Sequence, residues 1–447
     1  MSSVSISAKS SRRELWHLAW PLILANCTVP LLGMVDTAVV GHLPEPHHLG
    51  AVALGASTFA MAYLVFSSVR MGTTGLTAQA VGAGDGAEAR ACLVRPLGLA
   101  LLAGLVMILL GGPIVAAARF VFDPTPAVAG ELAAYIGWRL LGAPAALATF
   151  VLLGWLLGNH DTRSQFVLLV VPNAINAVLN VVFVFGFGWG VTGVAIATVI
   201  AEYAAVALGL VLARRRWCRL PGAFDAAVAL AWARFRRLFR VNGDLVVRSL
   251  FLEAVFLGFA ALSARQGEVL LAANAVLLTM IMLQAYALDG FAFAAEALAG
   301  RAVGRRSQDD LDAAFRAGAY WSVGFALLIA LVFAAGGGLV IALLTGIGEV
   351  RAAAGTFLVY VVVAPLVGAW AYLFDGIFSG ATQTRELRNG SILAAALFFA
   401  VAFPLTSALD NHGLWLALLL FLAARAVWLG WRYRRLAARA GFVSAPT

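Results

Sequence analysis

Long apolar segments recur along the whole chain and restrict it to structures that are stable in lipid. Examples are Leu97–Leu110 and Trp415–Ala424. Hydrophobic residues make up 62% of the 447 residues and charged residues only 12%, whereas soluble domains carry roughly 25% charged residues. Backbone that spans a bilayer must be helical or belong to a closed barrel. Because the runs are continuous and do not alternate, the sequence predicts an all-α integral membrane protein.

Twelve membrane-spanning helices are predicted, because each apolar run is long enough to cross a hydrocarbon core of about 30 Å. Arg12-Arg13 precedes the first run, but no small-residue cleavage site follows it, so this run is expected to be a retained helix. The predicted spans are 14–41, 48–82, 90–118, 128–157, 164–186, 190–213, 238–263, 268–299, 310–344, 350–379, 389–408 and 412–434.

Positive charge is concentrated in alternate loops. The formal net charge is +9, and one set of loops, including both ends of the chain, holds most of the arginines. The opposite loops hold little beyond Arg119, Arg265 and Arg351. Loops rich in Lys and Arg stay on the cytoplasmic side, so both termini are expected in the cytoplasm. The same distribution argues against a nucleic-acid surface.

The two halves of the chain repeat each other in order. The matches are offset by about 222 residues and include Ala143-Pro144 with Ala364-Pro365, Gly154–Gly158 with Gly376–Gly380, and Thr162-Arg163 with Thr384-Arg385. We therefore predict an N-terminal lobe over 1–213, a cytoplasmic linker over 214–237 and a C-terminal lobe over 238–447. Parallel repeats of this kind enclose a site between two bundles that rock to alternate its access.

Polar side chains inside the spans are candidate functional residues, because placing them in lipid is costly. Asp36 lies near the outer end of the first span, and a desolvated carboxyl there could change its protonation. Asn173, Asn176 and Asn180 share one face of the fifth span. Asp36 and Asn180 lie at similar depth, which predicts one hydrogen-bonded site. The alternatives are an aspartate in contact with headgroup water and amides that only join helices.

Oppositely charged residues suggest two further arrangements. Arg70 and Asp289 occupy nearly equivalent repeat positions and could form a gate or charge pair, or else two separate local pairs. Glu253 and Asp375 could share a cation site in the second half. No site is predicted for three more ionisable residues within spans, which are Glu202, Glu296 and Arg425. Glu296 and Arg425 are expected near helix ends.

No metal or cofactor site is predicted. The three cysteines lie far apart in sequence, and the chain contains neither a Walker A sequence nor a common hydrolase signature. His42, His47 and His48 lie with Glu45 in the first outer loop, but a metal ion there is not the favoured interpretation.

Four segments, spread in order over almost the whole chain, resemble a known family. They are Val29–His42, Arg70–Ala80, Ala285–Ala292 and Asp375–Thr382. The chain resembles the MATE (multidrug and toxic compound extrusion) family, in its DinF-like branch. The resemblance implies the MATE/MOP fold, with twelve helices in two pseudo-symmetric six-helix lobes. It also implies a monomeric transporter, not an enzyme, that binds small molecules among the lipids of a bacterial inner membrane.

The resemblance also implies roles for single residues. The family's proton-coupling aspartate of the first helix corresponds to Asp36, and polar positions of the fifth helix correspond to Asn176 and Asn180. Relatives often carry aspartate where this chain has Asn180, so Asp36 alone would carry the proton. Acidic positions of the sodium-coupled branch are similar to Glu253 and Asp375.

The favoured hypothesis is therefore cation-coupled antiport, with H⁺ as coupling ion, that exports amphipathic or cationic organic compounds. One alternative is sodium-coupled efflux. A second is a lipid-linked oligosaccharide flippase, which should have a strongly cationic cavity. A third is a polytopic membrane enzyme acting on lipid phosphates, for which the nearest motif is Asp309-Asp310-x-Asp312.

Overall fold

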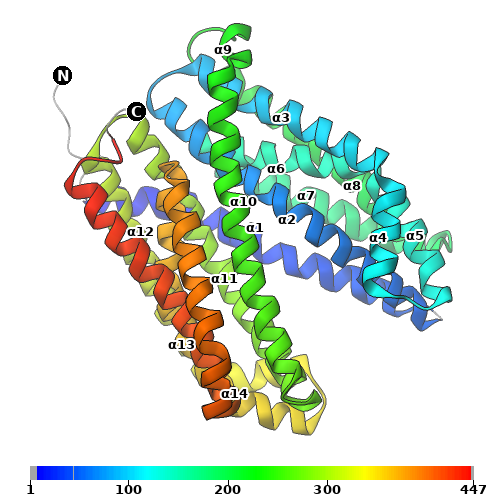
Figure 1. The fold of residues 1–447 in the computed structure, drawn as a ribbon. Coiled ribbons are helices and arrows are strands. Elements are labelled where there is room, and N and C mark those ends of the chain that lie inside the picture. The colour runs from blue at the N-terminus through cyan, green and yellow to red at the C-terminus, as the bar shows by residue number, and fades with distance from the viewer. Residues whose placement is uncertain (1–7, 44, 444–447) are drawn as a thin grey trace. The chain divides into compact units, whose positions relative to one another are not determined.

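The computed structural model describes residues 8–43 and 45–443, and within these ranges the secondary structure is helical (Figure 1). The first half contains α1 (Ala8–Gly41), α2 (Pro46–Gly82), α3 (Gly86–Leu109), α4 (Gly111–Phe122), α5 (Pro126–Leu140), α6 (Ala143–Gly158), α7 (Thr162–Val181), the π-helical turn η1 (Val182–Gly186) and α8 (Gly190–Trp217). The second half contains α9 (Ala226–Leu230), α10 (Trp232–Ala264), α11 (Glu268–Gly304), α12 (Gln308–Leu344), α13 (Gly348–Gly380) and α14 (Thr384–Ala438).

These helices supply the twelve predicted spans. Among the described residues, nine helices are long and apolar enough to cross a membrane, and α5 and α6 form a tenth span bent by 51°. The helix α1, with 34 residues, covers the first predicted span, 14–41. The helix α14 covers the last two predicted spans. It contains two helices joined at Asp410, whose φ of 51° and ψ of −136° are not helical. This junction lies between the predicted spans 389–408 and 412–434.

By their internal contacts the described residues divide into two compact units. The N-terminal unit is Leu24–Phe239, and the C-terminal unit combines the residues up to Ile23 with those from Arg240 onward. The helix α1 therefore contributes its first part to the C-terminal unit. There Glu14 accepts a hydrogen bond of 2.6 Å from Arg301. The predicted lobe boundaries at 213 and 238 remain a prediction.

Closely packed glycines place equivalent helices in the same way in each unit. A Cβ atom added at Gly154 of α6 would lie 2.4 Å from the carbonyl oxygen of Arg70 in α2. A Cβ atom at Gly376 of α13 would lie 2.1 Å from the carbonyl oxygen of Ala292 in α11. Both pairs are offset by about 222 residues, as the sequence repeat predicts. Only glycine allows backbones to approach this closely.

Two predicted spans are interrupted at prolines. A proline ring collides with the carbonyl group four residues earlier in a helix. Pro113 stands four residues after Leu109, where α3 ends, and Pro144 stands four residues after Leu140, where α5 ends. The predicted helix 90–118 is therefore two helices, and 128–157 is the bent pair α5 and α6.

The predicted linker is partly helical and is attached to α3. It contains the end of α8, all of α9 and the beginning of α10. The guanidinium group of Arg90, which is 4% exposed, donates hydrogen bonds to the carbonyl oxygens of Trp217, Leu220 and Pro221 at 2.8–3.1 Å. Arg95 donates to the carbonyl oxygen of Ala229 at 2.9 Å. The connection is therefore held against the N-terminal unit.

Candidate functional site

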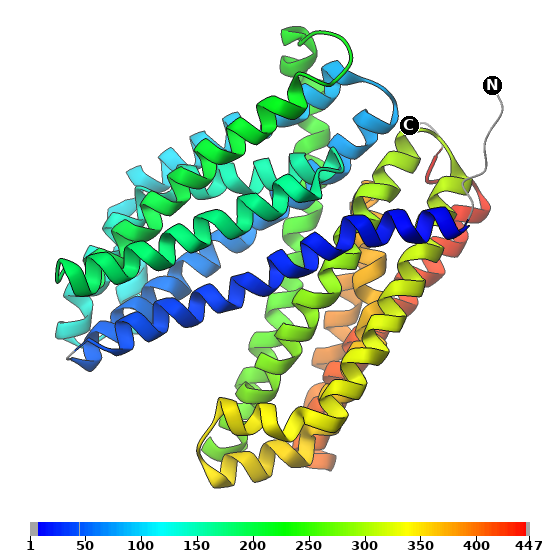
Figure 2. The ribbon, with the colours of Figure 1, turned by 180° about the vertical axis from the view of Figure 1, so that it is seen from behind.

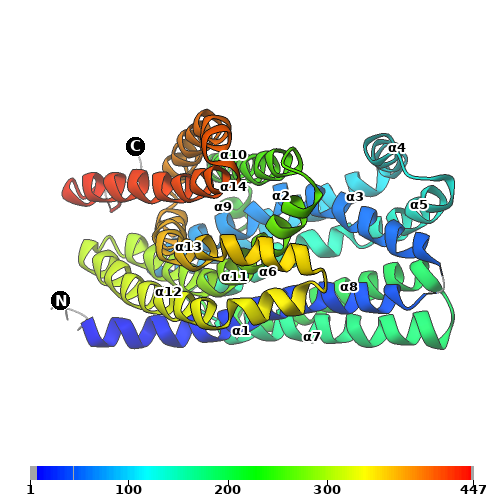
Figure 3. The same cartoon turned by 90° about the horizontal axis from the view of Figure 1, so that it is seen from below.

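A buried row of amides lies along one face of α7. Asn176 and Asn180 are 1% and 0% exposed. The side-chain amide of Asn180 donates a hydrogen bond of 3.0 Å to Oδ1 of Asn176. Asn176 in turn donates at 3.0 Å to the hydroxyl of Thr198 in α8, the helix beside α7 (Figures 2 and 3). The shared face is thus observed, and it joins α7 to α8.

The third amide connects α7 with α1. Asn173 is half-buried, and its amide donates a hydrogen bond of 3.4 Å to the hydroxyl of Thr28. Asp36 follows Thr28 by eight residues, and Asn180 follows Asn173 by seven. The rise from Thr28 to Asp36 along α1 is therefore similar to the rise from Asn173 to Asn180 along α7, about 11–12 Å in each case. The backbone of Asp36 belongs to α1, whereas its side chain lies outside the described residues.

The helix α7 changes its winding directly after this row. Its α-helical part ends at Val181, and the π-helical turn η1 follows. Such turns occur frequently at functional sites. The amide row therefore ends where the backbone departs from regular helix.

In the C-terminal unit Asp375 is held between two arginines. Arg425, which is 2% exposed, donates a hydrogen bond of 2.5 Å to Oδ2 of Asp375. Arg248 of α10 forms an ion pair with the same oxygen. With two guanidinium groups beside it, this carboxylate is a poor ligand for a further cation.

The suggested cation site of Glu253 and Asp375 stays a prediction, but the described contacts of the two residues differ. Glu253 lies five residues after Arg248 in α10, which turns its side chain about 140° around the helix axis. Its side chain is exposed, whereas Asp375 is buried. Among the described contacts, Asp375 pairs with arginines and not with Glu253.

The suggested pair of Arg70 and Asp289 remains a prediction. Arg70 belongs to the N-terminal unit and Asp289 to the C-terminal unit. Both side chains are half-buried. The glycine contacts make Ala292, not Asp289, the repeat equivalent of Arg70.

Glu202, Glu296 and Arg425, for which no site was predicted, are half-buried or buried and have partners. Arg139 donates a hydrogen bond of 2.7 Å to Glu202. Glu296 is 0% exposed and accepts a hydrogen bond of 2.9 Å from Ser379. Arg425 pairs with Asp375. The expectation that Glu296 and Arg425 lie near exposed helix ends is therefore wrong.

Two of the histidines noted in the sequence have a carboxylate partner that was not expected. His47 and His48 of α2 converge on Glu131 of α5, with nitrogen–oxygen distances of 2.7–3.1 Å. Glu131 stands more than 80 residues away in sequence, and no short motif could have signalled it.

Comparison with known proteins agrees with this architecture. The chain matches the model of the MatE family over residues 21–182 and 245–405, which are one segment from each half. It is 45% identical to DNA damage-inducible protein F of Escherichia coli (strain K12), over 95% of this chain and 93% of that protein. It is 28% identical to the probable multidrug resistance protein NorM of Xylella fastidiosa (strain 9a5c), over 93% and 90% of the two chains.

Solved structures share the fold. The Vibrio cholerae MATE transporter VcmN matches with a TM-score of 0.87 at 19% identity, over 98% of this chain and 100% of that chain. A MOP superfamily transporter from Pyrococcus furiosus matches with a TM-score of 0.85 at 18% identity, over 98% and 99%. The predicted MATE fold is therefore confirmed, as is the DinF-like branch by the Escherichia coli relative. The chain belongs to the MatE family and is a membrane transporter, not an enzyme.

Proposed function

We propose that this MatE-family transporter exports amphipathic or cationic organic compounds in exchange for protons, by alternating access, with Asp36 as the proton carrier. A transporter needs two ligands that each favour a different state. Protonation of Asp36 would favour one state, and the organic substrate would favour the other. Support for the substrate class comes from the relatives named as multidrug resistance proteins.

The observation that carries this proposal is the hydrogen-bonded amide row of α7. Asn176 and Asn180 are neutral, so they can accept from a protonated carboxyl or donate to an ionised one without fixing its charge. The contact between Asn173 and Thr28 brings α1 against this row. A similar rise along the two helices supports the proposal that Asp36 lies near the level of Asn180. A carboxyl at this level would have amide partners in both protonation states.

The arrangement of the C-terminal unit supports coupling in the N-terminal unit. Asp375 is balanced by Arg248 and Arg425. A sodium ion at Asp375 would have to displace at least one buried guanidinium group, which would leave an uncompensated charge. Glu253 is exposed and offers no second buried carboxylate. This balance of charge favours protons over sodium ions.

Efflux by inside-out vesicles tests the proposal. A cationic fluorescent dye is offered outside the vesicles, and its accumulation in the lumen is followed after the lumen is acidified or, separately, loaded with sodium. We expect the acid gradient to drive accumulation in the wild type and in Glu253→Gln, the matched change of an exposed carboxyl. Asp36→Asn should abolish it at equal protein level. Undiminished proton-driven accumulation in Asp36→Asn would exclude the proposed carrier.

A further inference from the structure

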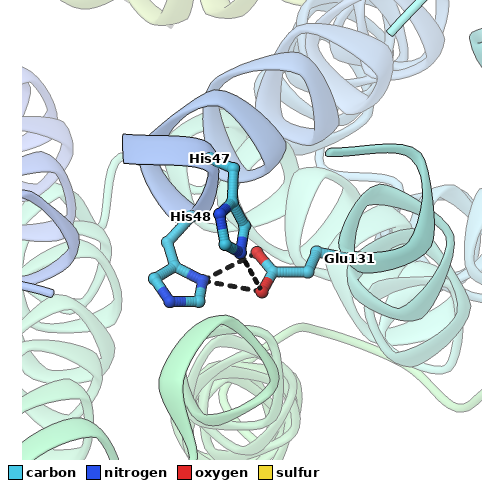
Figure 4. Close-up of side chains that lie close together, drawn as sticks. All are labelled: His47, His48 and Glu131. Atoms are coloured by element: carbon cyan, nitrogen blue, oxygen red, sulfur yellow. Dashed lines mark hydrogen bonds and ion pairs between the residues drawn. The ribbon is translucent and has the colours of Figure 1, made fainter. Parts of the chain in front are cut away.

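The N-terminal unit contains a cluster of metal-ligating side chains outside the amide row. It consists of His47 and His48, in the first turn of α2, and Glu131 of α5 (Figure 4). Nε2 of His47 lies 3.1 Å from Oε1 of Glu131. Nδ1 of His48 lies 2.7 Å from the same oxygen and 2.8 Å from Oε2. One potential ligand atom from each residue lies within 4.8 Å of the others.

Both ring nitrogens of His47 face carboxylate oxygens. Its Nε2 faces Glu131, and its Nδ1 lies 3.0 Å from Oε2 of Glu45. An ionised carboxylate only accepts hydrogen bonds, whereas a neutral imidazole has a single N–H. The contacts of His47 with Glu45 and with Glu131 are therefore both favourable only if positive charge is present. A second proton on the ring or a cation near Nε2 would supply it. A metal-bound histidine characteristically donates its other N–H to a carboxylate, as Nδ1 of His47 can do to Glu45.

We propose that His47, His48 and Glu131 bind a divalent transition-metal ion of the Zn²⁺ type. Two imidazoles and one carboxylate are a common ligand set for zinc. Ligand atoms about 2.05 Å from a tetrahedral ion lie about 3.3 Å apart. The two histidine nitrogens already lie 3.1 and 2.7 Å from Oε1 of Glu131. Binding therefore needs only small side-chain movements.

The surroundings leave room for the ion and for a fourth ligand. The side chains of His47, His48 and Glu131 are 24%, 20% and 27% exposed, so an ion can enter from solvent. A pocket of about 350 Å³ opens beside His48 and Glu131, with Leu43 and residues 188–192, at the beginning of α8, in its wall. Three protein ligands with an open position leave the fourth to water or to a ligand in this pocket.

The ion would join α2 to α5 within the N-terminal unit. His47 and His48 come from the start of α2, and Glu131 from the second turn of α5. An ion that binds only the folded unit stabilises it against unfolding. The site involves none of the amide-row residues, so the inference is independent of the proposed function.

The test is zinc binding by the purified, full-length, tag-free protein in detergent. Calorimetric titration with ZnCl₂ should give one site per chain, and zinc should raise the melting temperature. His48→Ala and Glu131→Gln should each weaken binding at least tenfold and remove the thermal shift. Glu45→Gln should weaken binding about tenfold, as for other outer carboxylates. Bound Co²⁺ should give the visible absorption of a four-coordinate site.

His42→Ala is the matched control, because this histidine lies just after α1, a few residues before His47, and is exposed, with Nδ1 2.7 Å from the carbonyl oxygen of Ala38. It should bind zinc like the wild type, and so should Asp36→Asn. Each variant is compared with the wild type by size-exclusion profile, and Co²⁺ absorption is read on the monodisperse fraction alone. The proposal is wrong if the wild type binds no zinc, or if His48→Ala and Glu131→Gln retain wild-type affinity.

Discussion

The side-chain amide of Asn180 donates a 3.0 Å hydrogen bond to Oδ1 of Asn176, one turn earlier on α7, and both residues are almost completely buried. Under the proposed function, a carboxylate in place of one of these neutral amides would stand near the level of Asp36 and repel its charge. The pair offers a direct way to alter the protonation of Asp36 without changing that residue.

Asn180→Asp should move the pH dependence of proton-driven efflux to higher pH. A carboxyl close to Asp36 would disfavour the state in which both are ionised, so protons would be released at higher pH. The measurement is initial dye efflux between pH 5.5 and 9, with the wild type in parallel. A profile identical to that of the wild type would show that residue 180 and Asp36 do not interact.

Gly376→Ala should destabilise the C-terminal unit strongly. The added Cβ would lie 2.1 Å from the carbonyl oxygen of Ala292, so α13 and α11 would have to separate. Overpacking of this kind costs about 1–3 kcal/mol or more. Thermal unfolding in detergent measures the loss.

Gly355→Ala, on the same helix, is the control for Gly376→Ala. No heavy atom lies within 4 Å of its added Cβ, and alanine favours helix by about 0.8–1.0 kcal/mol over glycine. It should leave stability unchanged or raise it slightly. Equal losses at the two positions would contradict the close helix approach at Gly376.

Asp375→Asn should destabilise the protein by about 3–5 kcal/mol, because it leaves Arg248 and Arg425 without the carboxylate they share. Glu253→Gln, which changes an exposed carboxyl, should alter stability by less than about 0.5 kcal/mol. Denaturant unfolding of both variants provides the comparison. An Asp375→Asn variant as stable as the wild type, but without a sodium response that the wild type shows, would instead support a cation site at Asp375.

Arg90→Ala should release the connection between α8 and α10. The guanidinium group of Arg90 donates to three carbonyl oxygens between Trp217 and Pro221, and the variant loses these three bonds. Limited proteolysis should cut the variant near residues 218–225 at least several times faster than the wild type. Arg163→Ala, which changes an exposed arginine at the start of α7, should not alter the rate. Equal cleavage rates for Arg90→Ala and the wild type would show that these bonds do not hold the segment.

The spans and the repeat were predictable because they depend on local properties of the sequence. A run of about 20 apolar residues fixes a span wherever its neighbours lie. Gly154 and Gly376 belong to the repeated segments, and the structure shows them at equivalent helix contacts. The division of α1 near Ile23 could not be predicted, because it depends on contacts with helices far along the chain.

The charge pairs were harder to predict, because their partners are distant in sequence. Asp375 lies 127 residues from Arg248 and 50 from Arg425. Arg248 and Glu253 point to different sides of α10. The periodicity of the sequence does not tell which side of this helix faces Asp375. The amide row of α7 was predictable, because i, i+3 and i+7 spacing defines one face of a single helix.

Proton release on substrate binding tests the central claim most directly. The purified transporter is mixed with a cationic dye in weakly buffered solution, and the pH change is recorded. If Asp36 exchanges its proton for substrate, the wild type should release protons in proportion to the dye bound. Asp36→Asn should bind dye without releasing protons. Equal proton release by Asp36→Asn and the wild type would contradict the account.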